Sequence, residues 1–157
     1  AARAAGAIAR LDPAPARQDG AAGSVWMAFD IVTPNEVEAE TFTGIRPGDR
    51  ESGQAVARRL VDLGAPAAIV TMGAAGCAWA REDGTAGYQP PFRVATVDTV
   101  AAGDCFNGAL AVALADGRPF EAAIRFAAAA GALATTKPGA AGAAPTRGDV
   151  DGLAQTI

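Results

Sequence analysis

The chain has 157 residues, half of them hydrophobic, which is enough for one domain or for part of a larger one. Its formal net charge is −4 and its basic residues form no stripe, so the composition argues against nucleic-acid binding. It contains no histidine, which excludes a Ser-His-Asp triad, a Cys-His pair and a zinc ion held by histidine.

The first residues predict a short strand between irregular segments. Residues 1–7 are typical of the end of a helix, and because the chain begins inside this Ala-rich segment we expect it to be a fragment. A strand starts at Ile8 and breaks at Pro13 and Pro15. A polar connection over residues 17–23 follows.

A second apolar strand is predicted over residues 29–33, followed by Pro34 and Asn35. Proline disfavours a helical conformation at the residue before it, and asparagine is a good helix N-cap. A short helix therefore follows Asn35, and Gly44 stops it.

The middle of the chain predicts a helix, a strand and a hairpin. Residues 49–63 have helical spacing and end at Gly64. The residues expected on the buried face of this helix are Val56, Leu60 and Leu63. Residues 67–71 form a buried strand, and an antiparallel hairpin turns at Asp83-Gly84.

The last third predicts one more strand and three helices. Residues 92–99 alternate like a strand, and residues 104–115 are helical with Gly117 as the C-cap. A second, Ala-rich helix covers residues 120–135. The remaining elements are a Gly/Ala loop over residues 137–145 and a last helix over residues 149–155.

Short apolar strands that alternate with helices predict an α/β fold with a mainly parallel sheet. In such sheets ligands bind beyond the carboxyl ends of the strands. Three loops are expected at those ends: residues 33–35, 71–76 and 98–104.

The stretch DTVAAGD, residues 98–104, contains small residues between two aspartates at the predicted start of a helix. Small residues before a helix leave its first-turn N–H groups open, and these groups favour an anion such as a phosphate. Asp104 could then accept a proton from an attacking hydroxyl, and Asp98 could hold a cation. The alternative is structural, with Asp104 as a helix cap and Gly103 as a turn residue. No Gly-Lys-Ser/Thr is present, so the stretch is not a Walker A loop.

DTVAAGDCFNGAL resembles the C-terminal signature D-T-x-G-A-G-D-x-F of the ribokinase (PfkB) family of carbohydrate kinases. Ala101 replaces the commoner first glycine, as it often does in ribokinases. The segments DPAPA, DIVTPNEVEAETFTGI, IVTMGAAGC and AIRFAAAAGALATTKPGA recur in the same order in bacterial members. The resemblance implies a ribokinase-like three-layer α/β/α fold with a mainly parallel sheet. Residues 1–157 would be its C-terminal ATP-binding and catalytic part, without the N-terminal half and the β-lid.

The resemblance also implies site residues. Asp104 corresponds to the catalytic base that contacts the sugar, within an anion hole formed by Ala101, Ala102, Gly103 and Asp104. Asn35 and Glu38 match an N-x-x-E motif that orders magnesium-bound water, although the pair also fits a helix cap. The residues implied in ATP binding are Asn35, Thr71, Met72, Gly73, Ala74, Ala75, Gly76, Gly103 and Ala128. Ala128 can contact adenine only by packing or through its backbone.

A monovalent cation, usually K⁺, is implied beside the anion hole. Its ligands would be Asp98, the carbonyls of Val100, Ala134, Lys137 and Gly139, and Ala143 at a position often held by serine. The Lys137 side chain would repel a cation, so only its carbonyl can serve. An ordinary Gly/Ala loop remains the alternative.

The implied activity is ATP-dependent phosphorylation of D-ribose at O5, with Mg²⁺ and K⁺ as cofactors and no membrane or nucleic-acid partner. The alternatives are another sugar or nucleoside kinase of the family, such as a fructokinase, and a non-catalytic nucleotide-binding remnant. Cys77 and Cys105 lie far apart and suggest a cytoplasmic protein without disulfides. Full-length relatives dimerise through the lid, and we expect the fragment alone to be inactive.

Overall fold

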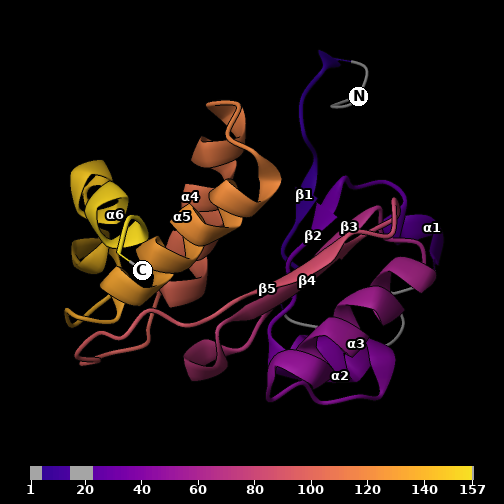
Figure 1. The fold of residues 1–157 in the computed structure, drawn as a ribbon, viewed down its shortest axis with the longest axis horizontal. Helices are drawn as coiled ribbons and strands as arrows, with labels where there is room; N and C mark the ends of the chain where they lie inside the picture. The colour runs from indigo at the N-terminus through magenta and orange to yellow at the C-terminus, as the bar shows by residue number, and fades with distance from the viewer. Residues whose placement is uncertain (1–4, 15–22, 157) are drawn as a thin grey trace. The chain divides into compact units, whose positions relative to one another are not determined.

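The computed structural model describes residues 5–14 and 23–156. The chain divides into two compact units, Ala1–Pro90 and Pro91–Ile157, which are described separately (Figure 1). The expectations for residues 1–4, for Pro15 and for the polar connection over residues 17–22 lie outside the described residues.

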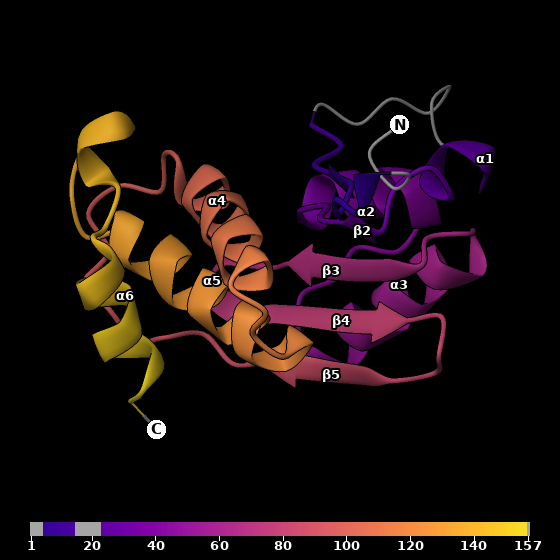
Figure 2. The same ribbon diagram turned by 90° about the horizontal axis from the view of Figure 1, so that it is seen from above.

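The first unit contains a five-stranded sheet in the order β1-β2-β3-β4-β5. Its strands are β1 (Arg10–Leu11), β2 (Ile31–Val32), β3 (Ala67–Thr71), β4 (Cys77–Arg81) and β5 (Ala86–Gln89). The first three strands are parallel, with Leu11 opposite Val32 and Val32 opposite Ala68. The pairs β3–β4 and β4–β5 are antiparallel, as their alternating arrowheads show (Figure 2). The α/β class and the predicted hairpin are therefore confirmed.

The helices of this unit are α1 (Gly23–Trp26), α2 (Glu36–Thr43) and α3 (Arg50–Asp62). Helix α3 packs against β3, β4 and β5 through Val56 and Leu60, which are fully buried, whereas Leu63 is half-buried at the C-cap. The sequence did not predict α1. It carries Trp26, which is buried in the core and meets the Phe42 ring edge-on at 4.9 Å between centroids.

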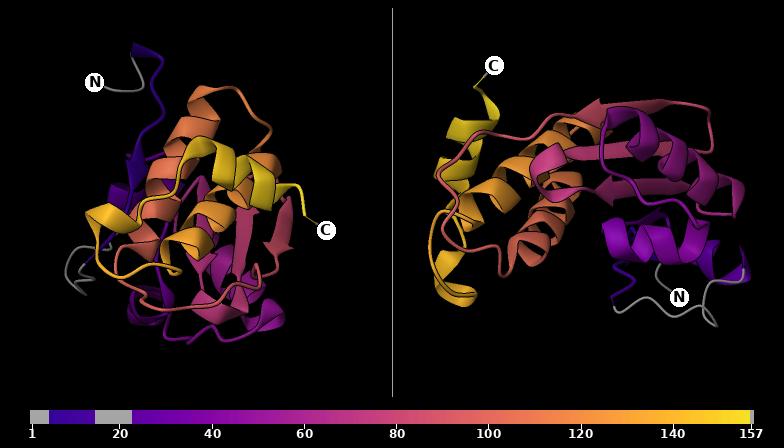
Figure 3. Two further views of the ribbon diagram at one scale, coloured as in Figure 1. Left: turned by 90° about the vertical axis from the view of Figure 1, so that its left-hand side faces the viewer. Right: turned by 90° about the horizontal axis from the view of Figure 1, so that it is seen from below.

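The second unit consists of α4 (Ala102–Ala115), α5 (Phe120–Ala134) and α6 (Arg147–Ala154), with a 3₁₀ turn at Ala141–Ala143. Helices α4 and α5 pack along each other and α6 packs against α5 (Figure 3). None of the described helices combines the length and apolar character that a membrane span requires.

The predicted strand over residues 92–99 is wrong, because this segment is irregular. A strand needs a neighbouring strand for its N–H and C=O groups, and none of the described strands pairs with residues 92–99. The N–H groups of Val97 and Asp98 instead both donate to the carbonyl of Thr135, at 2.7 and 3.1 Å.

The limits of α4 also differ from the prediction. The helix begins at Ala102, two residues before Asp104, and its N-cap is Ala101 in the left-handed conformation with φ 63°. The C-cap is Asp116, and Gly117 follows it with φ 74°. Asp104 therefore lies inside the first turn and does not cap the helix.

Candidate functional site

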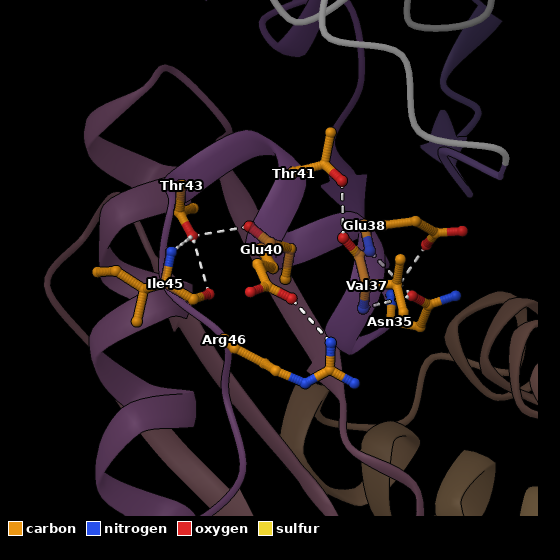
Figure 4. A network of polar contacts seen from close by, with 9 residues as sticks. Asn35, Val37, Glu38, Glu40, Thr41, Thr43, Ile45 and Arg46 are labelled. Carbon is orange, nitrogen blue, oxygen red and sulfur yellow. Dashed lines mark hydrogen bonds and ion pairs between the residues drawn. The ribbon is translucent and has the colours of Figure 1, made fainter.

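In the first unit, Asn35 and Glu38 form a reciprocal cap at the start of α2 (Figure 4). The Asn35 Oδ1 atom accepts hydrogen bonds from the N–H groups of Val37 and Glu38, at 2.9 and 3.0 Å. The Glu38 Oε2 atom accepts one from the N–H of Asn35 at 2.9 Å. The structural role expected for this pair is therefore confirmed.

Glu38 is an unusual cap residue because it is only 5% exposed. Burial raises the pKa of its carboxyl group, the hydrogen bond from the Asn35 backbone lowers it, and the nearby charge of Asp12 raises it further. A buried carboxylate near a second carboxylate is stabilised when a cation lies close to both. The burial of the Glu38 carboxylate near Asp12 is therefore a property that helix capping by Asn35 and Glu38 does not require.

The loop over residues 71–76 lies beside the start of α2. The N–H of Thr71 donates to the carbonyl of Pro34 at 3.0 Å, and Thr71 forms an isolated parallel bridge with Asn35. The loop closes on itself through a bond from the N–H of Met72 to the carbonyl of Gly76 at 2.8 Å. The structure thus brings together the two motifs predicted in this half of the chain.

Glycine is required in this loop by backbone conformation. Gly73 and Gly76 have φ values of 48° and 80°, a region that side chains with a Cβ rarely adopt. The loop contains a 3₁₀ turn over Gly73–Ala75, and the carbonyl of Ala75 accepts a hydrogen bond from the Tyr88 hydroxyl at 2.8 Å. The backbone of this loop is therefore held in one shape.

In the second unit, the first turn of α4 presents open N–H groups. Ala102 donates to the carbonyl of Thr99 at 3.3 Å, and Cys105 donates to that of Ala101 at 2.9 Å. Among the described residues, none accepts a bond from the N–H of Gly103 or Asp104. A Cβ at Gly103 would meet no heavy atom within 4 Å. Two donors at the positive end of the helix thus have no acceptor among the described residues.

The Asp104 side chain is exposed at this turn. No hydrogen bond or ion pair engages its carboxylate among the described residues, so the capping alternative has no support. Burial and the charge of Asp104 raise the pKa of the neighbouring Cys105 thiol. Asp104 is therefore free to accept a proton or to hold a polar ligand.

Asp104 also lines a pocket of about 500 Å³ within the second unit. The walls are mostly small or apolar side chains, and Asp104 and Arg147 are the only charged residues among them. The pocket was not predicted, because Phe126 and Ala130 reach it from α5 and Val150 from α6. Nothing in the sequence relates these positions to one another.

Asp98 joins two segments that are distant in the sequence. Its Oδ1 atom accepts the N–H of Val100 and its Oδ2 atom accepts the N–H of Gly139, each at 3.0 Å. These backbone hydrogen bonds hold the pKa of Asp98 below its usual range. Three of the residues predicted around a cation are thus brought together.

The other residues predicted to bind the cation or the adenine differ in burial. Ala134 and Ala143 are buried, Lys137 is exposed, and Ala128 is half-buried on α5. Ala134 lies four residues before Pro138, which has no N–H to donate, so the Ala134 carbonyl has no i+4 helical partner. Among the described residues, no group of three Asp, Glu, Cys or His side chains could hold a metal ion.

Comparison with known proteins identifies the family. The sequence profile of pfkB family carbohydrate kinases matches residues 1–147. The ribokinase of Haemophilus influenzae is 40% identical over 137 residues, which make up 87% of this chain and 44% of that protein. Fructokinase-1 of Oryza sativa subsp. japonica is 35% identical over 95% of the chain and 49% of its own length. The deoxyribokinase of Salmonella typhi is 37% identical over 87% and 44%.

Solved structures agree. Ribokinase from Thermotoga maritima has a TM-score of 0.81 at 34% identity, over 96% of this chain and 50% of that one. Arabidopsis thaliana ribokinase complexed with ribose and ATP has a TM-score of 0.86 at 30% identity, over 98% and 49%. The chain therefore belongs to the pfkB family of carbohydrate kinases and spans about half the length of these relatives.

Proposed function

We propose that this chain is the ATP-binding and catalytic part of a kinase that phosphorylates D-ribose at O5. The observation that carries the proposal is the first turn of α4. There, the N–H groups of Gly103 and Asp104 have no acceptor among the described residues, and the exposed Asp104 carboxylate makes no hydrogen bond or ion pair among them. Open donors and a free base at a helix start are the groups that phosphoryl transfer to a hydroxyl requires.

Asp104 would act as the general base of this transfer. Its carboxylate takes the proton of the sugar hydroxyl while the hydroxyl oxygen forms a bond to the γ-phosphorus of ATP. The bond from that phosphorus to the bridging oxygen breaks, and ADP leaves. The open N–H groups of Gly103 and Asp104 would stabilise the negative charge on the transferred group. The N–H of Ala102, which donates to the carbonyl of Thr99, would join them only if that bond opens, and Ala101 could add only its own N–H.

In the first unit, we assign nucleotide contacts to the backbone of residues 71–76 and Mg²⁺-bound water to Asn35 and Glu38. The buried Glu38 carboxylate, close to the charge of Asp12, fits a cation held through water. Mg²⁺ would neutralise charge on the phosphates of the bound nucleotide. In the second unit, Ala128 would contact the adenine only by packing.

The loops around Asp98 also fit a monovalent cation such as K⁺. The donors are hard oxygen atoms, namely one carboxylate and main-chain carbonyls, and the Ala134 carbonyl has no helical donor because residue 138 is proline. We assign Asp98 and the carbonyls of Val100, Ala134, Lys137 and Gly139 to this ion. Ala143 can contribute only its backbone.

D-Ribose is favoured as the acceptor because the ribokinase relative is 40% identical, above the fructokinase at 35% and the deoxyribokinase at 37%. Fructose and deoxyribose are the alternatives that these relatives support. A cytoplasmic location fits the two free cysteines, Cys77 and Cys105. Burial raises the pKa of the Cys77 thiol to about 12.

Calorimetric titration of the chain with ATP, with and without Mg²⁺, tests the nucleotide assignment. We expect binding that Mg²⁺ strengthens, and Glu38→Gln should remove the Mg²⁺ effect while its side-chain oxygen keeps the helix cap. Glu51→Gln, an exposed change in the first turn of α3, is the matched control. Absence of ATP binding by a folded chain would contradict the assignment.

A further inference from the structure

The loop over residues 71–76 has two backbone donors without an acceptor. Among the described residues, none accepts a hydrogen bond from the N–H of Gly73 or Ala74, whereas the other N–H groups of the loop donate to backbone carbonyls. Both open donors lie in the 3₁₀ turn over Gly73–Ala75. The first N–H groups of a helical turn have no partner within it. They are therefore the donors that this loop can offer to a ligand.

Met72 anchors the start of this turn. Its side chain is 2% exposed and belongs to the core of the first unit. A Cβ at Gly53 of α3 would lie 2.6 Å from the Met72 sulfur atom, so a larger residue at position 53 would force this side chain to move. The close approach holds the residue before the turn against α3.

Tyr88 of β5 anchors the end of the turn. Its hydroxyl donates to the carbonyl of Ala75 at 2.8 Å, across 13 positions of the sequence. Ala75 is the last residue of the turn, where carbonyls lack the N–H of a following turn. The hydroxyl supplies that missing donor, so the two open N–H groups lie between two anchored residues.

The Tyr88 ring is itself held from outside the loop. Tyr88 lies opposite Ala78 of β4, and residues directly opposite in an antiparallel pair point to the same face. Ala78 is fully buried in the core of the unit, and Tyr88 packs against that core. The guanidinium carbon of Arg50, the first residue of α3, is 5.7 Å from the centroid of the ring, within cation–π distance. The register of β5 and the start of α3 therefore set the position of the hydroxyl.

We propose that Tyr88 is a positioning residue for the nucleotide. By holding the Ala75 carbonyl, it keeps the open N–H groups of Gly73 and Ala74 directed at the bound nucleotide. That a nucleotide is the ligand rests on the proposed function, whereas the anchoring of the turn rests on the contacts of Tyr88 alone.

Tyr88→Phe tests the anchor, because it removes the hydroxyl and keeps the ring. Amide hydrogen exchange is measured by NMR on the whole ¹⁵N-labelled chain. It should be about fivefold faster in Tyr88→Phe at Ala75 and Gly76, whose N–H groups close the turn. Thr85→Val is the matched control, because it removes a hydroxyl that donates to Asp83 at the other end of the same hairpin. It should leave both amides unchanged.

Calorimetric titration with ATP and Mg²⁺ tests the consequence for the nucleotide. Tyr88→Phe should weaken ATP binding about fivefold, which is the effect of losing one ordinary hydrogen bond. Thr85→Val should keep the affinity of the unmodified chain, and thermal unfolding should show a similar loss of stability in both variants. Faster exchange in Tyr88→Phe with unchanged ATP affinity overturns the proposal, and so does a loss of affinity with unchanged exchange.

Failure of the proposed function gives a different result. If the unmodified chain binds no ATP, the nucleotide assignment fails, and faster exchange in Tyr88→Phe still supports the anchor. If ATP binds and Tyr88→Phe changes neither the exchange nor the affinity, the assignment stands and the role of Tyr88 is overturned.

A measurement on the unmodified chain decides if Tyr88→Phe does not fold. Tyr88 is the only tyrosine of the chain, so tyrosine labelled with ¹³C at Cζ gives one signal, which reports the exchange of its hydroxyl proton. ATP should slow this exchange, because a ligand that needs the anchored turn stabilises the bond that anchors it. ATP-dependent shifts at the amides of Gly73 and Ala74 without slower hydroxyl exchange would overturn the proposal.

Discussion

Gly131 of α5 lies against the backbone carbonyl of Ala102 in the first turn of α4. A Cβ at Gly131 would be 3.1 Å from that oxygen and 3.5 Å from the Cβ of Phe106. The absence of a side chain at Gly131 therefore permits the close approach of α5 to the turn that carries the open N–H groups.

Gly131→Ala should destabilise the protein by about 1 kcal/mol, because the cost of overpacking exceeds the gain in helix propensity. Thermal or urea unfolding followed by circular dichroism measures this. Gly108→Ala in α4 is the matched control, because a Cβ there meets nothing within 4 Å and should stabilise the helix. Equal stabilisation by both changes would show that the approach at Gly131 is not tight.

Ala101→Gly should raise stability by about 0.5–1 kcal/mol, because glycine adopts the left-handed conformation without the clash that a Cβ causes. The same substitution at Ala111, an exposed position inside α4, should have the opposite sign and cost about 1 kcal/mol. Urea unfolding of both variants compares the signs. Destabilisation by Ala101→Gly would mean that the strain is offset by contacts of the Ala101 methyl group.

Asp104→Asn should abolish phosphoryl transfer in an active protein that contains this chain, because an amide cannot accept the proton of the sugar hydroxyl. A loss of at least about a hundredfold in kcat is expected, with ATP affinity nearly unchanged. Coupled measurement of ADP release gives kcat, and calorimetry gives the affinity. Asp116→Asn, at the other end of α4, serves as the control. Retained turnover in Asp104→Asn would show that Asp104 is not the base.

Asp49, the N-cap of α3, predicts a dependence of stability on pH. Hydrogen bonds from the Ser52 side chain and backbone lower the pKa of its carboxyl group. A lowered pKa means that this group stabilises the fold above its unfolded pKa of about 4, and that the contribution disappears as the pH falls through the folded value. Asn is an equally good N-cap without a charge.

Asp49→Asn should therefore have nearly the stability of the unmodified chain at pH 2.5 and lower stability at pH 7. Urea unfolding at several pH values measures the difference. Ser52→Ala removes the side-chain hydrogen bond but keeps the bond from the Ser52 backbone N–H, so adding Asp49→Asn to it should change the pH dependence less than it does in the unmodified chain. A difference that does not vary with pH would contradict the role of the ionised carboxylate.

Local elements were predicted well because their causes are local. The cap formed by Asn35 and Glu38, the stop at Gly44 and the turn at Asp83-Gly84 depend on hydrogen bonds and φ preferences within a few residues. The alternation over residues 92–99 predicted a strand that the structure does not contain, because a strand forms only where a partner strand pairs with its N–H and C=O groups.

In the candidate site, too, the sequence predicted which residues take part but not their backbone conformation. The residues of DTVAAGD and their resemblance to a family signature predicted an anion site with Asp104 as its base, and these roles stay predictions. The helix start at Ala102 and the left-handed Ala101 were not predicted. The backbone before a helix depends on what its carbonyls and N–H groups bind, here Thr99 within the turn and Thr135 outside it.

By itself the sequence determined the family, the kinds of helix and strand, and the residues available for chemistry, since each is written in neighbouring positions. The tertiary structure decided which distant residues act together: Thr71 with Asn35, Gly131 with Ala102, and Asp98 with Gly139. Such pairs form only when packing brings segments far apart in the chain within hydrogen-bond or van der Waals distance. That distance cannot be read from the spacing of the residues along the sequence.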